Sequence, residues 1–336
     1  MDHQNYLDLA AKIASKIDPK KVHPNPRVGC VIVRNGEVVA SGVHERLGEN
    51  HAERNAIKEL TENSDLGSKN LGKGLEVYVS LEPCDDFDGK LTLSCTELLK
   101  SLKPDKVFVG SKDPKFNGDN LKQLTEEGIL TQYIANKNCE KLNKHWFLWK
   151  KRKKPFIHLK FAQTLDGKIF SQHFPLQISN ETSHKKVHDF RANVSAILTT
   201  TETVLLDNPY LNVREQVYSS QKHPDLIILG QRTIPNIAKI FESPGRDVFC
   251  FKDLNEFVAS NKYREIPLIL TECGAQMMTE LLDQDLVDRI SLFTAPKFFT
   301  HGKDAFSEEI PDFAENFQLQ TAIKLVNDVY LDYLRK

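Results

Sequence analysis

The sequence contains three residues of metal-ligating type, and a carboxylate lies close to one of them. His51, Cys84 and Cys95 offer an imidazole and two thiols, and Glu53 follows the histidine by two positions. Zinc prefers such nitrogen and sulfur ligands, and three protein ligands leave a fourth position open for water. Glu53 is near enough in sequence to move protons at that water without binding the metal. These residues therefore predict a catalytic zinc site in which Glu53 acts as acid and base.

The order of these residues is typical of zinc-dependent deaminases of nucleobases, which combine His-x-Glu with Pro-Cys and a second cysteine. Residues 76–84 are typical of a buried strand that runs into the ligand turn. Ala52 to Leu60 has helical spacing, so His51 and Glu53 are expected at a helix N-terminus. A structural interpretation stays open for each residue taken singly, because free cysteines are often buried as small hydrophobes.

Length and composition predict a two-domain globular protein. A chain of 336 residues exceeds the usual size of one core. The net charge of −1 gives no global field that would favour nucleic acid or a membrane. No apolar run approaches the roughly 18 residues of a membrane span, and the N-terminus lacks a signal pattern. Six cysteines without paired spacing are typical of a reducing compartment, so we expect a cytoplasmic protein.

The first 145 residues alternate between strand and helix patterns. Residues 4–17 are apolar on one helical face, and Val28 to Val33 is typical of a buried strand. Asn35-Gly36 is a strong two-residue hairpin signal, so Glu37 to Val43 should return antiparallel. Further strands and helices follow the ligand residues. The alternation predicts an α/β sandwich with a mixed sheet.

A basic run marks the expected domain boundary. Lys150 to Lys154 is a block of five cations that ends at Pro155. A nucleic-acid patch is one interpretation, but such runs are more often a solvated helix end and linker. We therefore expect a zinc-dependent deaminase domain over 1–149, a linker over 150–155 and a second domain over 156–336.

The second half has its own α/β pattern. Its predicted elements are a strand from Phe156 to Ala162, a helix over 180–192 capped by Asn180, a strand from Ala196 to Thr199, a polar turn at Thr200 to Thr203, three buried runs of parallel-sheet type at 225–229, 247–251 and 266–270, a helix from Ala275 to Leu282, and closing strands at Val287 to Ala295 and Ile323 to Leu334. No G-x-G-x-x-G motif is present, which argues against a Rossmann domain.

Motifs along nearly the whole chain resemble those of a known family, the bifunctional riboflavin-biosynthesis deaminase/reductases. They are Pro-Asn-Pro-Arg-Val-Gly-Cys from Pro24, His-Ala-Glu from His51, Leu-Glu-Pro-Cys from Leu81, Lys-Phe-Ala-Gln-Thr-Leu-Asp-Gly-Lys from Lys160, and Leu-Asn-Val-Arg from Leu211. The resemblance implies an N-terminal cytidine-deaminase-like α/β/α sandwich and a C-terminal dihydrofolate-reductase-like α/β domain.

In the deaminase half, the resemblance implies that His51, Cys84 and Cys95 bind Zn²⁺ and that Glu53 is the proton shuttle. The substrate would be 2,5-diamino-6-(5-phosphoribosylamino)pyrimidin-4(3H)-one, attacked by a zinc-activated water at its amino-bearing carbon. Asn25 matches a position that faces the base, although asparagine also suits a simple loop. His44 lies on the side where the zinc motif begins and is the second candidate for substrate contact.

In the reductase half, the resemblance implies hydride transfer from NADPH to the opened ribose, which gives a ribitylamino-uracil phosphate. The matching substrate positions are Lys160, Arg191, Leu211 and Arg214, and the matching cofactor positions are Thr203, Asp207, Glu272, Cys273 and Gly274. Arginine suits the substrate phosphate because its planar fork pairs bidentately with phosphate oxygens. The implied partner is a small pyrimidine ribosyl phosphate rather than nucleic acid or a membrane, and copies of the chain are expected to associate through the C-terminal domain.

The chain departs from the family pattern at several positions. The Cys84–Cys95 loop is two residues longer, and the usual tryptophan is absent from 175–179. A glycine is missing within 199–203, Asn208 replaces an aspartate, Cys273 replaces a glycine, and 297–302 lacks the usual glycine-rich turn. Two alternatives therefore stay open: an active deaminase with a non-catalytic second domain, and a zinc deaminase of another base, including a base in RNA. A non-catalytic zinc-stabilised binding protein is a third class.

Overall fold

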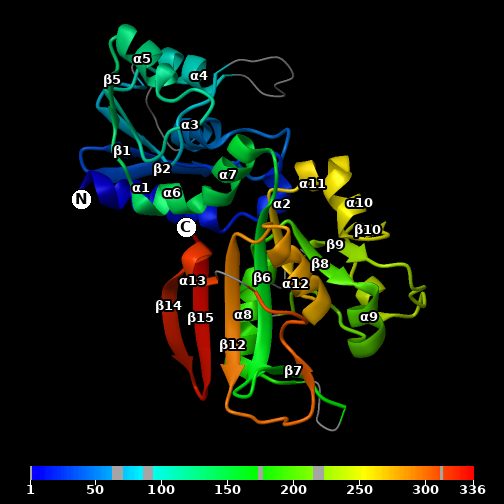
Figure 1. The fold of residues 1–336 in the computed structure, drawn as a ribbon. Coiled ribbons are helices and arrows are strands. Elements are labelled where there is room, and N and C mark those ends of the chain that lie inside the picture. The colour runs from blue at the N-terminus through cyan, green and yellow to red at the C-terminus, as the bar shows by residue number, and fades with distance from the viewer. Residues whose placement is uncertain (1, 63–70, 86–93, 173–176, 215–222, 311–312) are drawn as a thin grey trace. The chain divides into compact units, whose positions relative to one another are not determined.

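The chain forms two compact units in the computed structural model, Met1–Lys151 and Arg152–Lys336. The structure describes residues 2–62, 71–85, 94–172, 177–214, 223–310 and 313–336. Each unit is built on its own large sheet with helices packed against it (Figure 1). The prediction of two α/β domains of different kinds is confirmed.

The first unit contains a mixed five-stranded sheet of order β2-β1-β3-β4-β5. β1 pairs antiparallel with both β2 and β3, whereas β3, β4 and β5 are parallel. The predicted hairpin at Asn35-Gly36 is confirmed, since Gly36 takes a positive φ of 80° and Arg34 pairs with Glu37. The strands are β1 Gly29–Arg34, β2 Glu37–Val43, β3 Leu75–Val79, β4 Lys106–Val109 and β5 Leu130–Tyr133.

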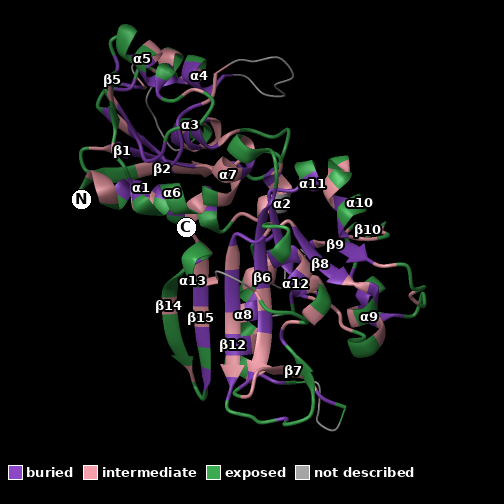
Figure 2. Ribbon diagram, viewed as in Figure 1, coloured by how far each residue is buried: buried purple, intermediate pink, exposed green. Residues whose placement is uncertain are grey.

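Side chains of the central strands alternate between two helical layers, as strand geometry requires. Val31 and Val33 pack with α1, whereas Cys30 and Ile32 pack with α3 on the opposite face. The strands are largely buried as a result (Figure 2). The helices are α1 His3–Ser15, α2 Pro19–Val22, α3 Ala52–Glu62, α4 Cys95–Leu102, α5 Asp119–Glu126, α6 Lys137–Leu142 and α7 Lys144–Arg152.

The second unit contains an eight-stranded sheet of order β10-β9-β8-β11-β6-β12-β15-β14. Its first six strands are parallel, and β15 and β14 close the sheet antiparallel. The strands are β6 Phe156–Thr164, β8 Ala196–Thr200, β9 Asp225–Leu229, β10 Val248–Phe251, β11 Leu268–Thr271, β12 Arg289–Ala295, β14 Phe317–Leu325 and β15 Asp328–Arg335, with a separate ribbon of β7 Lys168–Phe170 and β13 Lys303–Asp304.

Parallel order puts the carboxyl ends of six neighbouring strands at one edge, so segments that follow these strands gather there. The connecting elements are α8 Glu181–Ala192, α9 Thr201–Asp207, η3 Lys239–Phe241, α10 Leu254–Ala259, α11 Asn261–Glu265, α12 Ala275–Asp283 and α13 Phe313–Asn316. The predicted cap of α8 is confirmed: Asn180 accepts a hydrogen bond from the Ser183 amide at 3.0 Å.

Two predicted elements are wrong. The polar turn at Thr200 to Thr203 is the start of helix α9, because the Thr200 hydroxyl caps it by accepting from the Thr203 amide at 3.2 Å. The single closing strand from Ile323 to Leu334 is a hairpin, since β14 and β15 meet at a turn where Val326 has a φ of 61°. The apolar alternation on both sides of this turn hid it in the sequence.

The basic run after residue 149 begins inside α7. The Lys150 ammonium lies 4.6 Å from the Trp149 ring centroid, and Arg152 pairs with buried Asp288. Residues 86–93 of the long ligand loop, and residues 175 and 176 of the segment that lacks the tryptophan, lie outside the described residues. None of the described helices is long and apolar enough to cross a membrane.

The close packing of α3 against β2 gives a test of what stabilises the first unit. A Cβ on Gly42 would lie 2.3 Å from both the Ala52 carbonyl oxygen and the Ala56 nitrogen, which are backbone atoms. Gly42→Ala should therefore lower the free energy of unfolding by about 1–3 kcal/mol. Both tryptophans, Trp146 and Trp149, belong to this unit, so urea unfolding followed by tryptophan fluorescence reports on it. Exposed Glu37→Ala on the same strand is the control, and equal stability of the two variants would contradict the packing constraint.

Candidate active sites

The three predicted metal ligands meet in the first unit. His51 directly precedes α3, Cys84 follows β3, and Cys95 begins α4, yet their ligand atoms all lie within 4.8 Å of one another. The His51 Nδ1 atom is 3.2 Å from Cys84 Sγ and 3.4 Å from Cys95 Sγ. A hydrogen bond from the Cys95 thiol and another from the His51 ring lower the pKa of Cys84 and favour its thiolate. This soft donor set fits zinc, which when bound activates a water molecule as a nucleophile.

Glu53 is buried in the first turn of α3, with only 2% of its surface exposed. Burial raises the pKa of its carboxyl above the usual range. A carboxyl whose pKa is raised toward neutrality can both take and return a proton. Glu53 therefore has the environment that an acid–base residue needs.

His44 and Asn25 lie together beside the ligand cluster. The His44 ring centroid is 4.9 Å from that of His51, and Asn25 Nδ2 is 3.3 Å from His44 Nε2. The Nδ1 atom of His44 faces the Asn50 carbonyl oxygen at 3.0 Å and so donates to it. Nε2 is then an acceptor for the Asn25 amide, and burial lowers the pKa of His44 and favours this neutral form. The structure thus brings together the two residues that were predicted to contact the deaminase substrate.

Glu82 has a positioning role that the sequence did not reveal. Its carboxylate accepts hydrogen bonds from the backbone amides of Gly118 at 2.9 Å and Asn120 at 3.2 Å, at the start of α5. The Asn120 side chain in turn donates to the Pro83 carbonyl oxygen at 2.8 Å. These bonds hold the turn that carries Cys84. Only the position of Glu82 inside the Glu-Pro-Cys motif hinted at such a role.

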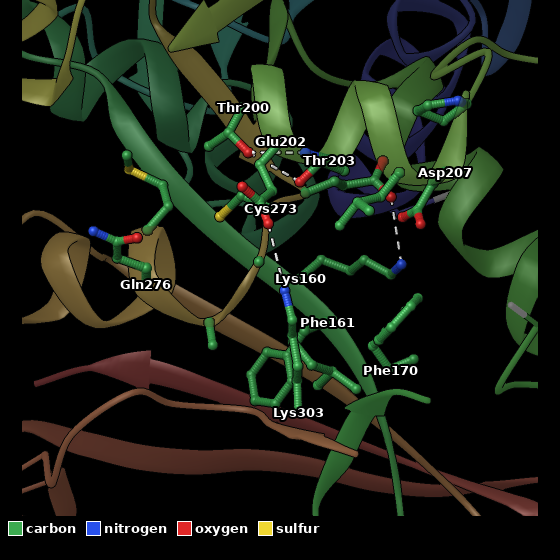
Figure 3. A pocket seen from close by; sticks show the side chains of 18 of the residues that line it. Lys160, Phe161, Phe170, Thr200, Glu202, Thr203, Asp207, Cys273, Gln276 and Lys303 are labelled. Carbon is green, nitrogen blue, oxygen red and sulfur yellow. Dashed lines mark hydrogen bonds and ion pairs between the residues drawn. The ribbon is translucent and has the colours of Figure 1, made fainter. Parts of the chain in front are cut away.

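A cavity of about 930 Å³ lies at the carboxyl ends of the parallel strands in the second unit. Most of the predicted reductase residues line it: Lys160, Arg191, Thr203, Asp207, Leu211, Glu272, Cys273 and Gly274. Figure 3 shows Lys160, Thr203, Asp207 and Cys273 among the side chains around this space. Arg214 is not among the lining residues; its guanidinium lies 5.2 Å from the Tyr210 ring centroid. The β7–β13 ribbon also lines the cavity, through Phe170 and Lys303, two residues that no sequence motif marked.

An ion cluster with little exposure to solvent lies in the wall of the cavity. Arg191 binds Glu272 through two bonds, Nε to Oε1 at 2.6 Å and Nη2 to Oε2 at 2.9 Å, and Lys160 Nζ is 3.3 Å from Oε2. Burial alone would raise the pKa of Glu272, but the two cations outweigh it and hold that pKa at about 2. Glu272 is therefore ionised at neutral pH. Arg191 also donates to the Asn212 carbonyl oxygen at 3.2 Å, which ties the segment after α9 to the cluster.

The cofactor candidates surround α9 and the end of β11. The Thr203 hydroxyl is 3.0 Å from that of Thr200, and burial raises the pKa of Asp207. Burial likewise raises the pKa of Cys273, so its thiol is protonated at neutral pH. A Cβ on Gly274 would meet nothing within 4 Å, which leaves open space in front of this residue.

Both units match known protein families. Residues 155–331 match the RibD C-terminal domain, and residues 1–111 match the cytidine and deoxycytidylate deaminase zinc-binding region. The riboflavin biosynthesis protein RibD of Actinobacillus pleuropneumoniae is 31% identical to this chain over an alignment of 351 positions, gaps included. The alignment covers 93% of this chain and 90% of that protein. The chain belongs to the RibD family.

Further relatives match most or all of the chain. RibD of Aquifex aeolicus is 31% identical and covers 89% of this chain and 88% of its own. The solved diaminohydroxyphosphoribosylaminopyrimidine deaminase/5-amino-6-(5-phosphoribosylamino)uracil reductase of Thermotoga maritima superposes with a TM-score of 0.85 at 28% identity, covering 100% of both chains. RibD of Acinetobacter baumannii gives 0.83 at 26% identity, covering 99% of both.

Family membership confirms the predicted enzyme class and cofactors. The chain is a bifunctional riboflavin-biosynthesis enzyme with a zinc-dependent deaminase domain and an NADPH-dependent reductase domain that acts on a small molecule. The match of the second unit to the RibD reductase domain does not favour the alternative of a non-catalytic module.

A histidine behind the ion cluster gives a pH test of the second unit. Burial, together with nearby Arg191 and Arg214, lowers the pKa of His188 to about 4. An unfolded histidine has a pKa of about 6.5, so between these values the unfolded state binds more protons and stability falls as the pH drops. His188 should cost about 2 kcal/mol of unfolding free energy between pH 7 and pH 5.

His188→Gln should remove most of that difference, because glutamine is neutral and can still accept from the Arg214 amide. Urea unfolding of the full chain, followed by circular dichroism at both pH values, measures it. His301→Gln, at an exposed position, is the control. An unchanged pH dependence in His188→Gln would show that His188 is not the group responsible.

Proposed function

We propose that the chain deaminates 2,5-diamino-6-(5-phosphoribosylamino)pyrimidin-4(3H)-one and then reduces the product with NADPH to a ribitylamino-uracil phosphate. One observation carries the proposal: a His-Cys-Cys cluster with a buried glutamate in one unit accompanies a cavity with a buried Lys-Glu-Arg cluster in the other. The Thermotoga maritima relative is named for both activities, which supports this substrate.

In the deamination, His51, Cys84 and Cys95 hold zinc and Glu53 moves the protons. Glu53 takes a proton from the attacking water and gives it to the ring nitrogen. It then takes the proton of the new hydroxyl group and gives it to the amino group, so that the C–N bond breaks, ammonia leaves and a carbonyl remains. The Asn25 amide and His44 face the pyrimidinone. The Asn25–His44 hydrogen bond supports this role, because it fixes the neutral tautomer of His44 and leaves one N–H of the amide to donate to the base.

In the reduction, the Lys160–Glu272–Arg191 cluster marks the reacting end of the cavity, where NADPH supplies a hydride to the opened ribose. Lys160, which lies on β6 and lines the cavity, is the member of the cluster that can donate a proton there, because arginine keeps its proton in proteins. Three N–H groups of Arg191 are engaged with Glu272 and Asn212, which leaves one on each terminal nitrogen for a substrate phosphate. Thr203, Asp207, Cys273 and Gly274 line the cofactor space.

The segment that precedes Arg214 is built for substrate contact. Leu211 is buried and has a φ of 44°, an uncommon conformation for a bulky residue that often marks a functional site. Arg246 holds this backbone by donating to the carbonyl oxygens of Tyr210 at 2.9 Å and Leu211 at 2.7 Å. Leu211 and Arg214 are therefore assigned to the substrate.

Association of copies through the second unit is a separate part of the proposal. The outer strand β14 ends the sheet, and Leu319, Ile323 and neighbouring Val329 are 48%, 41% and 42% exposed. An apolar edge strand favours pairing with another chain. Light scattering on the purified protein measures its mass, and a monomer would refute this part alone.

The substrate assignment is tested by incubating the zinc-loaded protein with the diaminopyrimidinone, with and without NADPH. Ammonia release followed by NADPH loss is expected. Ammonia without NADPH loss would select the non-catalytic second domain, and no ammonia would refute the deaminase substrate. Binding to tRNA at physiological salt would instead support a deaminase of a base in RNA.

Glu53→Gln tests the proton shuttle. Glutamine has nearly the same shape but cannot accept and return a proton, so ammonia release should fall by about 10²–10⁴-fold while zinc stays bound. Ammonia assay and metal analysis measure the two effects separately. Glu62→Gln, at an exposed position on the same helix, should change neither. Full activity of Glu53→Gln would point to a non-catalytic role for the residue.

Arg191→Met tests the ion cluster. Loss of its cation leaves Glu272 buried with Lys160 alone, so the unfolding free energy should fall by about 3 kcal/mol and NADPH oxidation should cease. Ammonia release, which depends on the other unit, should persist. The triple variant Lys160→Met/Arg191→Met/Glu272→Met should regain stability without reductase activity, because it removes all three charges of the cluster.

Lys185→Met, at an exposed position on the same helix α8, is the control for Arg191→Met. Reductase activity in the stable triple variant would show that the cluster serves the fold alone.

A further inference from the structure

One motif of the sequence has no role in the chemistry assigned above, the Leu-Asp-Gly-Lys run that follows β6. Its carboxylate, Asp166, does not line the reductase cavity. Asp166 lies in the turn between β6 and β7, where Gly167 has a φ of 77° and donates its amide to the Thr164 carbonyl oxygen at 3.0 Å. Any part that Asp166 has in the reaction must therefore act through the residues that it contacts.

The Asp166 carboxylate joins this turn to the segment that follows β12. It accepts hydrogen bonds from the backbone amides of Phe299 at 3.2 Å and Thr300 at 2.8 Å, which lie 133 and 134 positions later in the chain. It also accepts from the Thr164 hydroxyl at 2.5 Å. The bond from Thr164, followed by the two amides, lowers the pKa of Asp166, so the carboxylate is ionised at neutral pH.

Thr300 has a backbone conformation that needs this restraint. Its φ is 49°, in the left-handed region that β-branched residues rarely adopt. Such a conformation persists only where the surrounding contacts fix it. The bond to Asp166 is one such contact, and the Leu165 amide, which donates to the Lys297 carbonyl oxygen at 2.9 Å, is a second. The turn over 297–300 therefore depends on the turn over 164–167.

Phe299 is the side chain that this arrangement places. It is buried in a small apolar cluster with Ile178 and Ala295, and Ala162 packs against this cluster. Phe299, Ile178 and Ala162 all line the cavity. Side chains from three separate segments thus form one apolar wall, and Asp166 holds the segment that contributes the aromatic ring.

This wall lies beside the reacting end of the cavity. Ala162 and Lys160 are two positions apart on β6 and both line the cavity, so they share one face of the strand, about 7 Å apart along it. A hydride moves only between atoms held about 3–3.5 Å apart, and a misplacement of about 1 Å can cost 100-fold in rate. A shift of Phe299 should therefore slow the reaction.

We propose that Asp166 is a positioning residue of the reductase, which fixes Phe299 in the cavity wall through the turn at Thr300 and so keeps the reacting groups aligned. The inference rests on the reductase function proposed above and adds a residue that touches neither substrate nor cofactor. A carboxylate suits this task because its two oxygens can accept all three hydrogen bonds, whereas asparagine offers a single acceptor oxygen.

Asp166→Asn, made in the full zinc-loaded chain, tests the proposal. Calorimetric titration with NADPH counts the sites that bind it, and the single-turnover rate of NADPH oxidation is then expressed per site. The Kd for NADPH should stay within about fivefold, while the rate per site should fall by about 10–100-fold. A merely structural role would reduce the number of sites and leave the rate per site unchanged, and this result would overturn the proposal.

Thr300→Gly shows whether Asp166 acts through the turn. Glycine adopts a positive φ without strain, so the turn should keep its shape with fewer restraints. In the Thr300→Gly background, Asp166→Asn should therefore lower the rate per site by no more than about threefold. A loss as large as in the wild-type background would show that Asp166 does not act through Thr300, and the proposal would fail.

Asp283→Asn, at an exposed position at the end of α12 and outside the cavity lining, is the matched control and should behave as wild type. An unchanged rate per site in Asp166→Asn, beside an active wild type, would refute this inference alone. A wild type that binds NADPH but does not oxidise it in the presence of the diaminopyrimidinone would refute the proposed function instead.

Discussion

The second unit depends on keeping one buried carboxylate ionised. Glu272 is 8% exposed at the carboxyl end of β11, where desolvation disfavours its charge. Arg191 and Lys160 reverse that balance with three hydrogen bonds. These partners come from α8 and β6, so the charge can be satisfied only when both elements pack correctly beside β11. The cluster therefore joins folding and function: the same contacts that neutralise Glu272 shape the reacting end of the cavity.

The first unit meets a similar constraint with different groups. An imidazole and two thiols converge from three segments, and burial disfavours a thiolate without a positive partner. These residues would hold zinc through both sulfurs, and the cluster would then stabilise the fold as well as serve catalysis. Glu82, two residues before Cys84, also has a buried carboxylate. Hydrogen bonds from the backbone amides of Gly118 and Asn120 offset the cost of burying it. Hydrogen bonds to Glu82 and Pro83 therefore help to hold the turn that carries Cys84.

The ligand set and most elements could be predicted because each rests on local signals. His51 and Glu53 share one helical turn, and Asn35-Gly36 and Asn180 act within a few residues. The role of Glu82 could not be predicted, since its partners lie more than 30 residues away. The meeting of Lys160 and Glu272 also depends on strand order, since β6 and β11 are neighbours in the sheet but far apart in the sequence. Contacts between residues that are far apart in the sequence are therefore the part of the structure that local patterns do not predict.

The structure also explains why two departures from the family pattern are compatible with the fold. Asn208 ends α9 with a φ of 41°, a left-handed conformation that asparagine tolerates better than most residues, and its side chain accepts from the Lys239 amide at 2.9 Å. Cys273 brings a side chain to the wall of the cavity, but open space remains in front of Gly274, the next residue. A cofactor can approach the backbone there even though the preceding residue is no longer glycine. The departures thus change the surface that the cofactor meets and leave the strand ends and the ion cluster in place.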